Sequence, residues 1–77
     1  METTLADLQA GERGVIIGFT LPMETQLRFM ELGFLEGHEV RLVRVAPLKD
    51  PLEVGVLSSK ISIRRAEASG IRLKRLG

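Results

Sequence analysis

The fold of this chain is decided by the stretch Gln26-Leu-Arg-Phe-Met-Glu-Leu-Gly-Phe-Leu-Glu-Gly37, which runs directly into His38-Glu-Val-Arg-Leu-Val-Arg-Val45. Apolar residues recur every three or four positions, a spacing that predicts one face of a short helix. This face is formed by Met23, Leu27, Met30 and Phe34. Gly33 follows the helix, and a glycine there favours a left-handed C-terminal cap because it has no Cβ to clash. Gly37 predicts a second bend, so we expect the chain to turn from helix into strand within a few residues.

Alternating apolar residues predict strands on both sides of this helix. One strand precedes it at 14–19, and two interleaved glycines there are typical of a tightly curled small sheet. In the strand that follows, the apolar positions change parity at Leu42-Val43, which predicts a bulge. Further strands are expected at 52–56, 61–63 and 71–73, with a hairpin turn at Ser58-Ser59. Single helical turns are predicted near residues 3–8 and at 64–70. The pattern therefore indicates a mainly β fold of about five strands.

Several motifs resemble those of the FeoA family, the small cytosolic partners of the bacterial ferrous-iron transport system. The similarity covers the chain from about Leu5 to Leu73, and its motifs are Leu27-Arg-Phe-Met-Glu-Leu-Gly-Phe34, Glu36-Gly37, Val40, Val43-Arg44, Ala46-Pro47-Leu48, Asp50-Pro51-Leu52-Glu53-Val54 and Ile63-Arg64-Arg65-Ala66-Glu67-Ala68. The resemblance implies an SH3-like barrel, a fold also found at the C-terminus of metal-dependent repressors. It further implies a single domain over residues 1–77. The family pattern leads us to expect a glycine and an aromatic residue near Leu57-Ser-Ser-Lys60, where this chain has neither.

Composition places the chain among small globular proteins. It has 77 residues, 44% of them hydrophobic, and a mean hydropathy of +0.12. No apolar run approaches the roughly 20 residues that span a bilayer, and the first residues lack the basic flank of a signal peptide. We therefore expect a cytoplasmic protein without direct membrane insertion. The absence of cysteine excludes disulfides and thiolate metal ligands, so the fold must be stabilised by packing.

Charge is distributed unevenly along the sequence. Residues 1–38 carry a net charge of −4 and residues 39–77 a net charge of +5. If the two halves fold onto each other, much of this asymmetry becomes internal complementarity. Basic residues near the C-terminus are able to contact phosphates, but the chain has no Tyr or Trp and only three Phe for stacking on bases. This basic group is formed by Arg64, Arg65, Arg72, Lys74 and Arg75. A solvated charged face is favoured, and nucleic-acid binding is disfavoured.

The sequence offers little material for metal binding or catalysis. His38 is the only histidine, and the nearest carboxylates in sequence are Glu36 and Glu39. Iron and zinc sites need several converging donors, so we predict no metal site beyond a weak ion at Glu36 and His38. Ser58 and Ser59 have no base suggested by the sequence. We predict a non-enzymatic protein without catalytic residues or cofactors.

Binding is the remaining function class. The resemblance implies an accessory protein of ferrous-iron uptake that docks on the cytosolic, G-protein-containing part of the iron permease. As partner contacts we predict apolar residues taken to be exposed on the helix and the proline-bounded loop, with one rim charge: Phe29, Leu35, Leu48 and Lys49. Self-association remains open. Two alternatives also remain, a stand-alone repressor-type barrel that modulates a metal-responsive regulator, and a small RNA-binding barrel.

Overall fold

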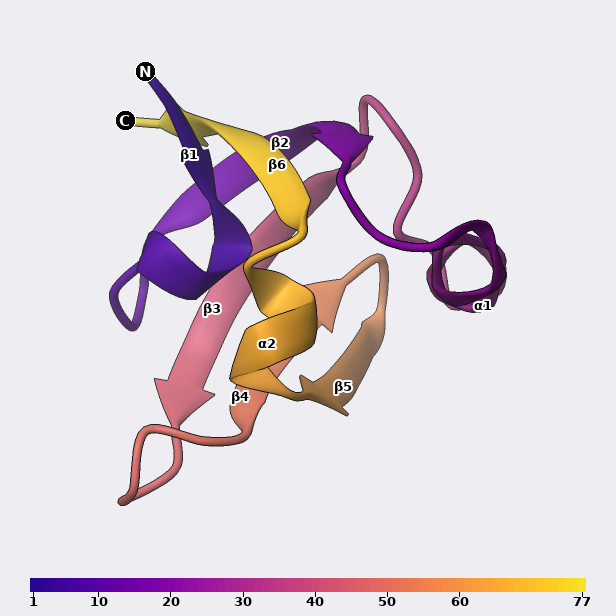
Figure 1. Cartoon of the computed structure of the whole chain (residues 1–77). Coiled ribbons are helices and arrows are strands. Elements are labelled where there is room, and N and C mark those ends of the chain that lie inside the picture. Colours follow the sequence, from indigo (N-terminus) through magenta and orange to yellow (C-terminus); the bar gives the residue numbers. More distant parts are fainter.

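Six antiparallel strands form one strongly curved sheet in a computed structural model that describes all residues 1–77 (Figure 1). The strand order across the sheet is β1-β6-β2-β3-β4-β5. The strands are β1 Glu2–Thr4, β2 Arg13–Phe19, β3 Glu39–Val45, β4 Leu52–Val56, β5 Ser59–Ile63 and β6 Ile71–Leu76. The helices are η1 Leu5–Asp7, a single 3-10 turn, α1 Met23–Glu31 and α2 Arg65–Ala68. The predicted mainly β architecture and the placement of all three helices are confirmed. None of these helices is long and apolar enough to cross a membrane.

The predicted glycine cap ends α1. Gly33 has φ +106°, and its N–H donates to the carbonyl of Met30 at 3.0 Å. The N–H of Phe34 donates to the carbonyl of Phe29, also at 3.0 Å. These two bonds together make a Schellman motif, whose usual apolar contact is supplied by the rings of Phe29 and Phe34 at a centroid distance of 5.3 Å. The cap therefore fixes both the end of α1 and the direction in which the chain enters β3.

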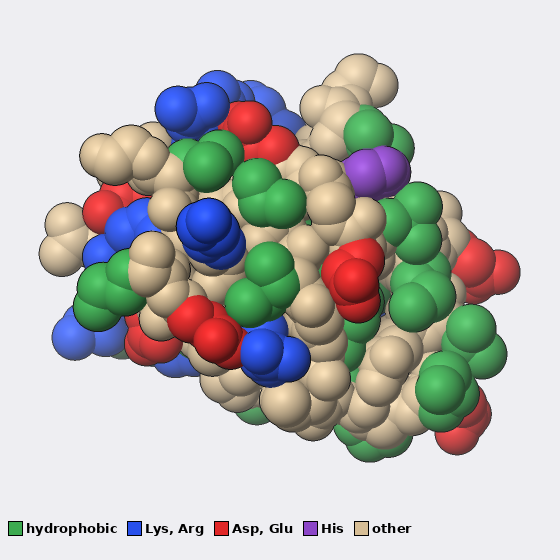
Figure 2. Space-filling view, turned by 90° about the horizontal axis from the view of Figure 1, so that it is seen from above, with side chains coloured by type: hydrophobic (Ala, Val, Ile, Leu, Met, Phe, Trp, Pro, Cys, Tyr) green, Lys and Arg blue, Asp and Glu red, His purple; other side chains and the backbone are tan.

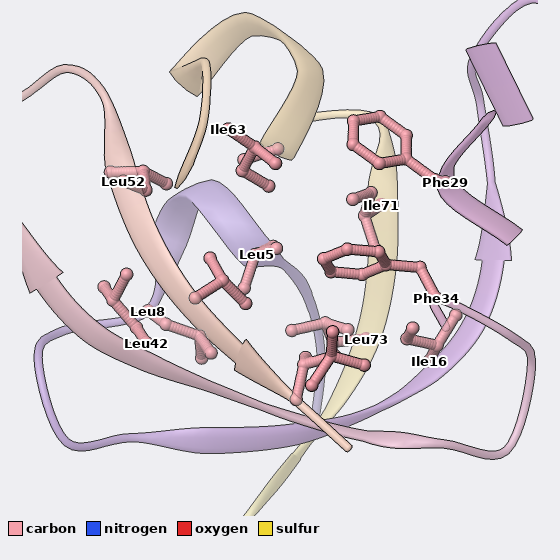
Figure 3. Packing of buried hydrophobic residues seen from close by; sticks show 14 residues of the cluster. Leu5, Leu8, Ile16, Phe29, Phe34, Leu42, Leu52, Ile63, Ile71 and Leu73 are labelled. Atoms are coloured by element: carbon pink, nitrogen blue, oxygen red, sulfur yellow. The ribbon is translucent and has the colours of Figure 1, made fainter. Parts of the chain in front are cut away.

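The core is a cluster of fourteen buried hydrophobic side chains, which Figure 3 shows as sticks. Phe29 and Phe34 are its largest members, and both rings point into the cluster (Figure 3). The prediction that Phe29 is exposed is therefore wrong. Met23 and Leu27, by contrast, lie on the surface. The helix rests on the core through one aromatic ring, and its more regular apolar stripe faces solvent.

Local sheet features agree with the sequence in part. The register between β3 and β4 shifts between Leu42 and Arg44, which confirms the predicted bulge. The β4–β5 turn is Leu57-Ser58, one residue earlier than predicted, because Val56 pairs with Ser59. The structure also has one strand more than expected. This strand is β1, which pairs with β6 and places the two chain ends side by side (Figure 1).

Candidate protein-docking surface

An apolar stripe runs along the outer side of α1. Met23 and Leu27 are four residues apart and therefore share a helix face, and they are 64% and 54% exposed. Met30 continues this stripe and is half-buried. Leu35 and Leu57 extend it beyond the C-terminal end of the helix. Figure 2 shows hydrophobic side chains gathered over the side of the molecule where α1 lies. We call these five residues the α1 apolar surface.

Leu57 joins this surface from the β4–β5 turn. A Cβ built on Gly33 would lie 2.8 Å from Cδ1 of Leu57, so the leucine side chain lies directly against the cap of α1. Leu57 is nevertheless 72% exposed, and its φ is +54°. A leucine in this left-handed region is uncommon, because its Cβ approaches the following carbonyl oxygen. Leu57 thus combines an exposed apolar side chain with an unfavourable backbone conformation.

Acidic side chains border the α1 apolar surface. Glu24, Glu31 and Glu36 are exposed and form no ion pair. Arg28, the one cation on the helix, is instead paired with Glu67 of α2 and lies over the ring of Phe29 at 5.2 Å. The surface is therefore apolar in its centre and negative along one border, and Figure 2 shows acidic groups at the edge of this side of the molecule.

A further exposed apolar residue lies apart from this surface, on the loop between β3 and β4. Leu48 is 90% exposed, and Lys49 has φ +69°. Arg65 of α2 holds this loop. Its Nε donates to the carbonyl of Lys49 at 2.8 Å, and its backbone N–H donates to Oδ1 of Asp50 at 3.0 Å. A further bond from Nη1 of Arg65 to the carbonyl of Ala6, at 2.8 Å, connects the loop to η1.

The predicted contact residues do not form one surface. Phe29 is 1% exposed and belongs to the core, which removes it from any contact on the folded protein. Leu35 is 39% exposed and lies at the end of α1. Leu48 and Lys49 lie on the β3–β4 loop, which Figure 1 shows at the opposite end of the molecule from α1. Sequence reasoning missed Met23, Leu27 and Leu57 as surface residues. No sequence pattern indicated that Leu57 would occupy the turn, or that α1 would contact the core mainly through the ring of Phe29.

Most of the basic residues near the C-terminus form ion pairs or hydrogen bonds with other residues of the protein. Nε of Arg72 donates to Oε2 of Glu2 at 2.9 Å, and Arg75 lies 3.8 Å from Oε1 of Glu12. Arg65 is occupied by the loop contacts described above. The positive second half of the sequence is thus partly neutralised by the negative first half, as the charge distribution indicated.

His38 directly precedes β3. Its Nδ1 is 2.9 Å from the carbonyl oxygen of Gly33, so Nδ1–H donates to that oxygen and ties the imidazole to the cap of α1. No group of three or more His, Cys, Asp or Glu side chains is placed to hold a metal ion.

Comparison with known proteins assigns the family. The FeoA domain model matches residues 3–75. The chain belongs to the FeoA family. This assignment confirms the predicted resemblance and the prediction of a non-enzymatic protein. A curated relative from Porphyromonas gingivalis, an Fe(2+) transport protein A/Fe(2+) transporter FeoB fusion protein, is 30% identical over 70 residues. The aligned region covers 91% of this chain and 8% of that relative, so the chain corresponds to a small part of the fusion protein.

Solved structures of the family share the fold. The FeoA protein of Chlorobium tepidum has a TM-score of 0.92 at 33% identity, covering 97% of this chain and 71% of that one. FeoA of Stenotrophomonas maltophilia, described as an SH3 domain protein complexed with zinc, has a TM-score of 0.82 at 30% identity, covering 94% and 89%. A manganese-dependent transcriptional repressor has a TM-score of 0.88 at 14% identity, covering 97% and 41%. The SH3-like fold is therefore confirmed, and the likeness to the repressor is one of fold alone.

Proposed function

We propose that this protein is an accessory protein of ferrous-iron uptake that docks on the cytosolic, G-protein-containing domain of the iron permease. Two observations support an association of this kind. The chain belongs to the FeoA family, and in the Porphyromonas gingivalis relative an FeoA-like segment and the transporter FeoB are parts of one fusion protein. Two proteins that are fused in one organism commonly act together when they are separate.

The α1 apolar surface carries the proposal. Burying a leucine or methionine side chain is worth about 1.5–3 kcal/mol, and small monomers seldom leave several such side chains exposed together. The core is already filled by Phe29, Phe34 and their neighbours, so these side chains have no place inside. Docking would remove Met23, Leu27 and Leu57 from water, with Leu35 at the edge. Leu48 and Lys49 on the β3–β4 loop are proposed as a second, separate contact.

A binding titration with the isolated permease domain tests the proposal. Leu27→Glu places a charge in the centre of the surface and keeps a good helix former, so the fold should remain intact. We expect docking to weaken by about 2 kcal/mol or more, the effect of a hot-spot residue. Ala66→Glu is the matched control, since it adds the same charge to the exposed side of α2. Wild-type protein that fails to bind the domain would contradict the proposal, and equal affinity of Leu27→Glu and Ala66→Glu would contradict the assigned surface.

The two alternatives receive less support. The similarity to the manganese-dependent repressor is at 14% identity and concerns the fold. The RNA-binding alternative depended on a free basic group, of which Arg65, Arg72 and Arg75 are engaged within the protein. A shift of RNA mobility by the wild-type protein, without binding of the permease domain, would favour this alternative.

A further inference from the structure

A row of residues crosses three strands next to the α1 apolar surface. Arg41 of β3 pairs with Gly55 of β4, and Gly55 pairs with Lys60 of β5. Residues that are paired across antiparallel strands project to the same face of the sheet. Arg41 and Lys60 are both exposed, so the row lies on the outer face. Two cations therefore flank a position that has no side chain.

Gly55 leaves a notch between them. Its φ does not lie in the left-handed region, so the backbone itself does not require glycine. A Cβ at this position would lie 3.6 Å from Cγ2 of Val43 and 4.0 Å from Nη2 of Arg41, which are ordinary contacts. A hollow of about 560 Å³ extends from this position over the β4–β5 turn. We call the hollow the Gly55 notch, and the residues that line it beside Gly55 include Glu39, Arg41, Leu57, Ser58, Ser59 and Lys60.

The notch has a net positive charge that the protein does not compensate. Glu39 is the one carboxylate in the lining, and it pairs with Arg13, which continues the row on β2, at 3.2 Å between Oε2 and Nη1. Arg41 and Lys60 form no ion pair. The hydroxyl groups of Ser58 and Ser59 are not in hydrogen bonds within the protein, so they remain available as donors. Two free cations and two free hydroxyls around one hollow are suited to an oxyanion.

The position of Leu57 favours a carboxylate on a protein segment over the phosphate of a nucleic acid. Leu57 belongs both to the lining of the Gly55 notch and to the α1 apolar surface, so one ligand segment is able to contact both. No Phe, Tyr or Trp lines the notch, and the one ring in its lining, the imidazole of His38, is tied to the carbonyl of Gly33 through Nδ1. A nucleobase therefore finds little stacking surface there. A carboxylate next to apolar side chains on a protein segment fits both features.

We infer that the Gly55 notch binds an acidic side chain of the docking segment of the permease domain and thereby sets the orientation of that segment on the α1 apolar surface. The inference rests on the proposed function. The notch is positive at one end of the surface, and Glu24, Glu31 and Glu36 make its border negative. A docking segment that carries an acidic residue at one end, to enter the notch, and basic residues along one side, to face the three glutamates, can therefore bind in one direction only.

Calorimetric titration of variants of this chain with the permease domain tests the inference. The double variant Arg41→Gln/Lys60→Gln removes both charges, and we expect about tenfold weaker binding or more, as for the loss of a charged hydrogen bond. Lys74→Gln is the charge control, because this exposed lysine lies on β6, and its affinity should stay within about twofold of the wild-type value. Raising the salt concentration should weaken the wild type more than the double variant.

Gly55→Val provides a test without a change of charge. Valine suits a strand, and the contacts around Gly55 leave room for its Cβ, so the midpoint of chemical denaturation should not fall. The valine fills the notch, and we expect docking to weaken about tenfold. If this variant is unstable, the double glutamine variant alone decides the question.

The outcomes separate the inference from the proposed function. Weak binding by the notch variants with normal binding by Lys74→Gln supports the inference. Normal binding by the notch variants, together with weak binding by Leu27→Glu, overturns the inference and leaves the docking surface in place. Absence of wild-type binding overturns both. Binding of single-stranded RNA that requires Arg41 and Lys60 would overturn the assignment to a carboxylate.

Discussion

At the scale of single residues, Leu57 combines two unfavourable properties, a left-handed backbone and an apolar side chain in water. Replacing it tests whether both are retained for docking. Leu57→Asn places a residue that tolerates this backbone region in the turn, so thermal stability should rise by up to about 1 kcal/mol. Affinity for the permease domain should fall, because the apolar contact is lost. Leu57→Met keeps both properties and is the matched control, and a loss of stability in Leu57→Asn would contradict this account of the turn.

Gly33 and Gly37 separate backbone strain from side-chain crowding. Both have positive φ, +106° and +90°, but a Cβ would meet Leu57 at 2.8 Å in the first case and nothing within 4 Å in the second. Alanine at either position should cost roughly 1–3 kcal/mol through strain. Gly33→Ala should cost more than Gly37→Ala, since Leu57 must also move. Thermal melts of the two variants measure the difference, and equal midpoints would show that Leu57 does not rest on the cap.

At the scale of elements, the β3–β4 loop presents Leu48 on a scaffold supplied by Arg65. Leu48→Asp should change the free energy of unfolding by no more than about 0.5 kcal/mol, because the side chain is 90% exposed. If the loop is the second docking contact, the same change should weaken docking by about 2 kcal/mol. Chemical denaturation and a binding titration on the same protein give both values.

The control for the loop is a combined variant. Leu48 and Leu27 lie on separate elements at opposite ends of the molecule, so the effects of Leu48→Asp and Leu27→Glu on docking should add. Unchanged docking by Leu48→Asp would restrict the contact to the α1 apolar surface.

Caps and bulges could be predicted from the sequence because each depends on the backbone preferences of a few neighbouring residues. The cap at Gly33 and the bulge at Leu42 each follow from a few neighbouring residues. The orientation of α1 could not be predicted in this way. Its periodic stripe predicts a buried face, whereas the structure buries Phe29, whose ring packs against that of Phe34 beyond the cap.

The candidate sites depended on information that a single sequence lacks. The alternation of the flanking strands predicts the turn at Ser58-Ser59 and leaves Leu57 outside it, and no propensity predicts a leucine at positive φ. The Gly55 notch required the pairing register, which alone brings Arg41 and Lys60 to either side of the same glycine. The short strand β1 was missed because three residues carry no recognisable alternation.

At the scale of the whole molecule, the position of the two chain ends limits how a fused partner can reach the docking surface. β1 and β6 pair, and both ends leave the barrel on the side away from α1 (Figure 1). The molecule measures 29 × 25 × 23 Å, so a tether from either end must pass around the barrel. At about 3.5 Å per residue, a fully extended tether needs at least about eight residues, and a flexible one about twenty.

The minimum tether length can therefore be used to locate the docking surface relative to the paired termini. Fusion proteins that join this chain to the permease domain through about four glycine and serine residues should leave α1 open to a competing copy of that domain. A tether of about twenty residues should close the surface to the competitor, because the attached domain then acts at a high effective concentration. Competition measured against tether length gives the result directly, and closure by the shortest tether would place the docking surface beside the chain ends instead of on α1.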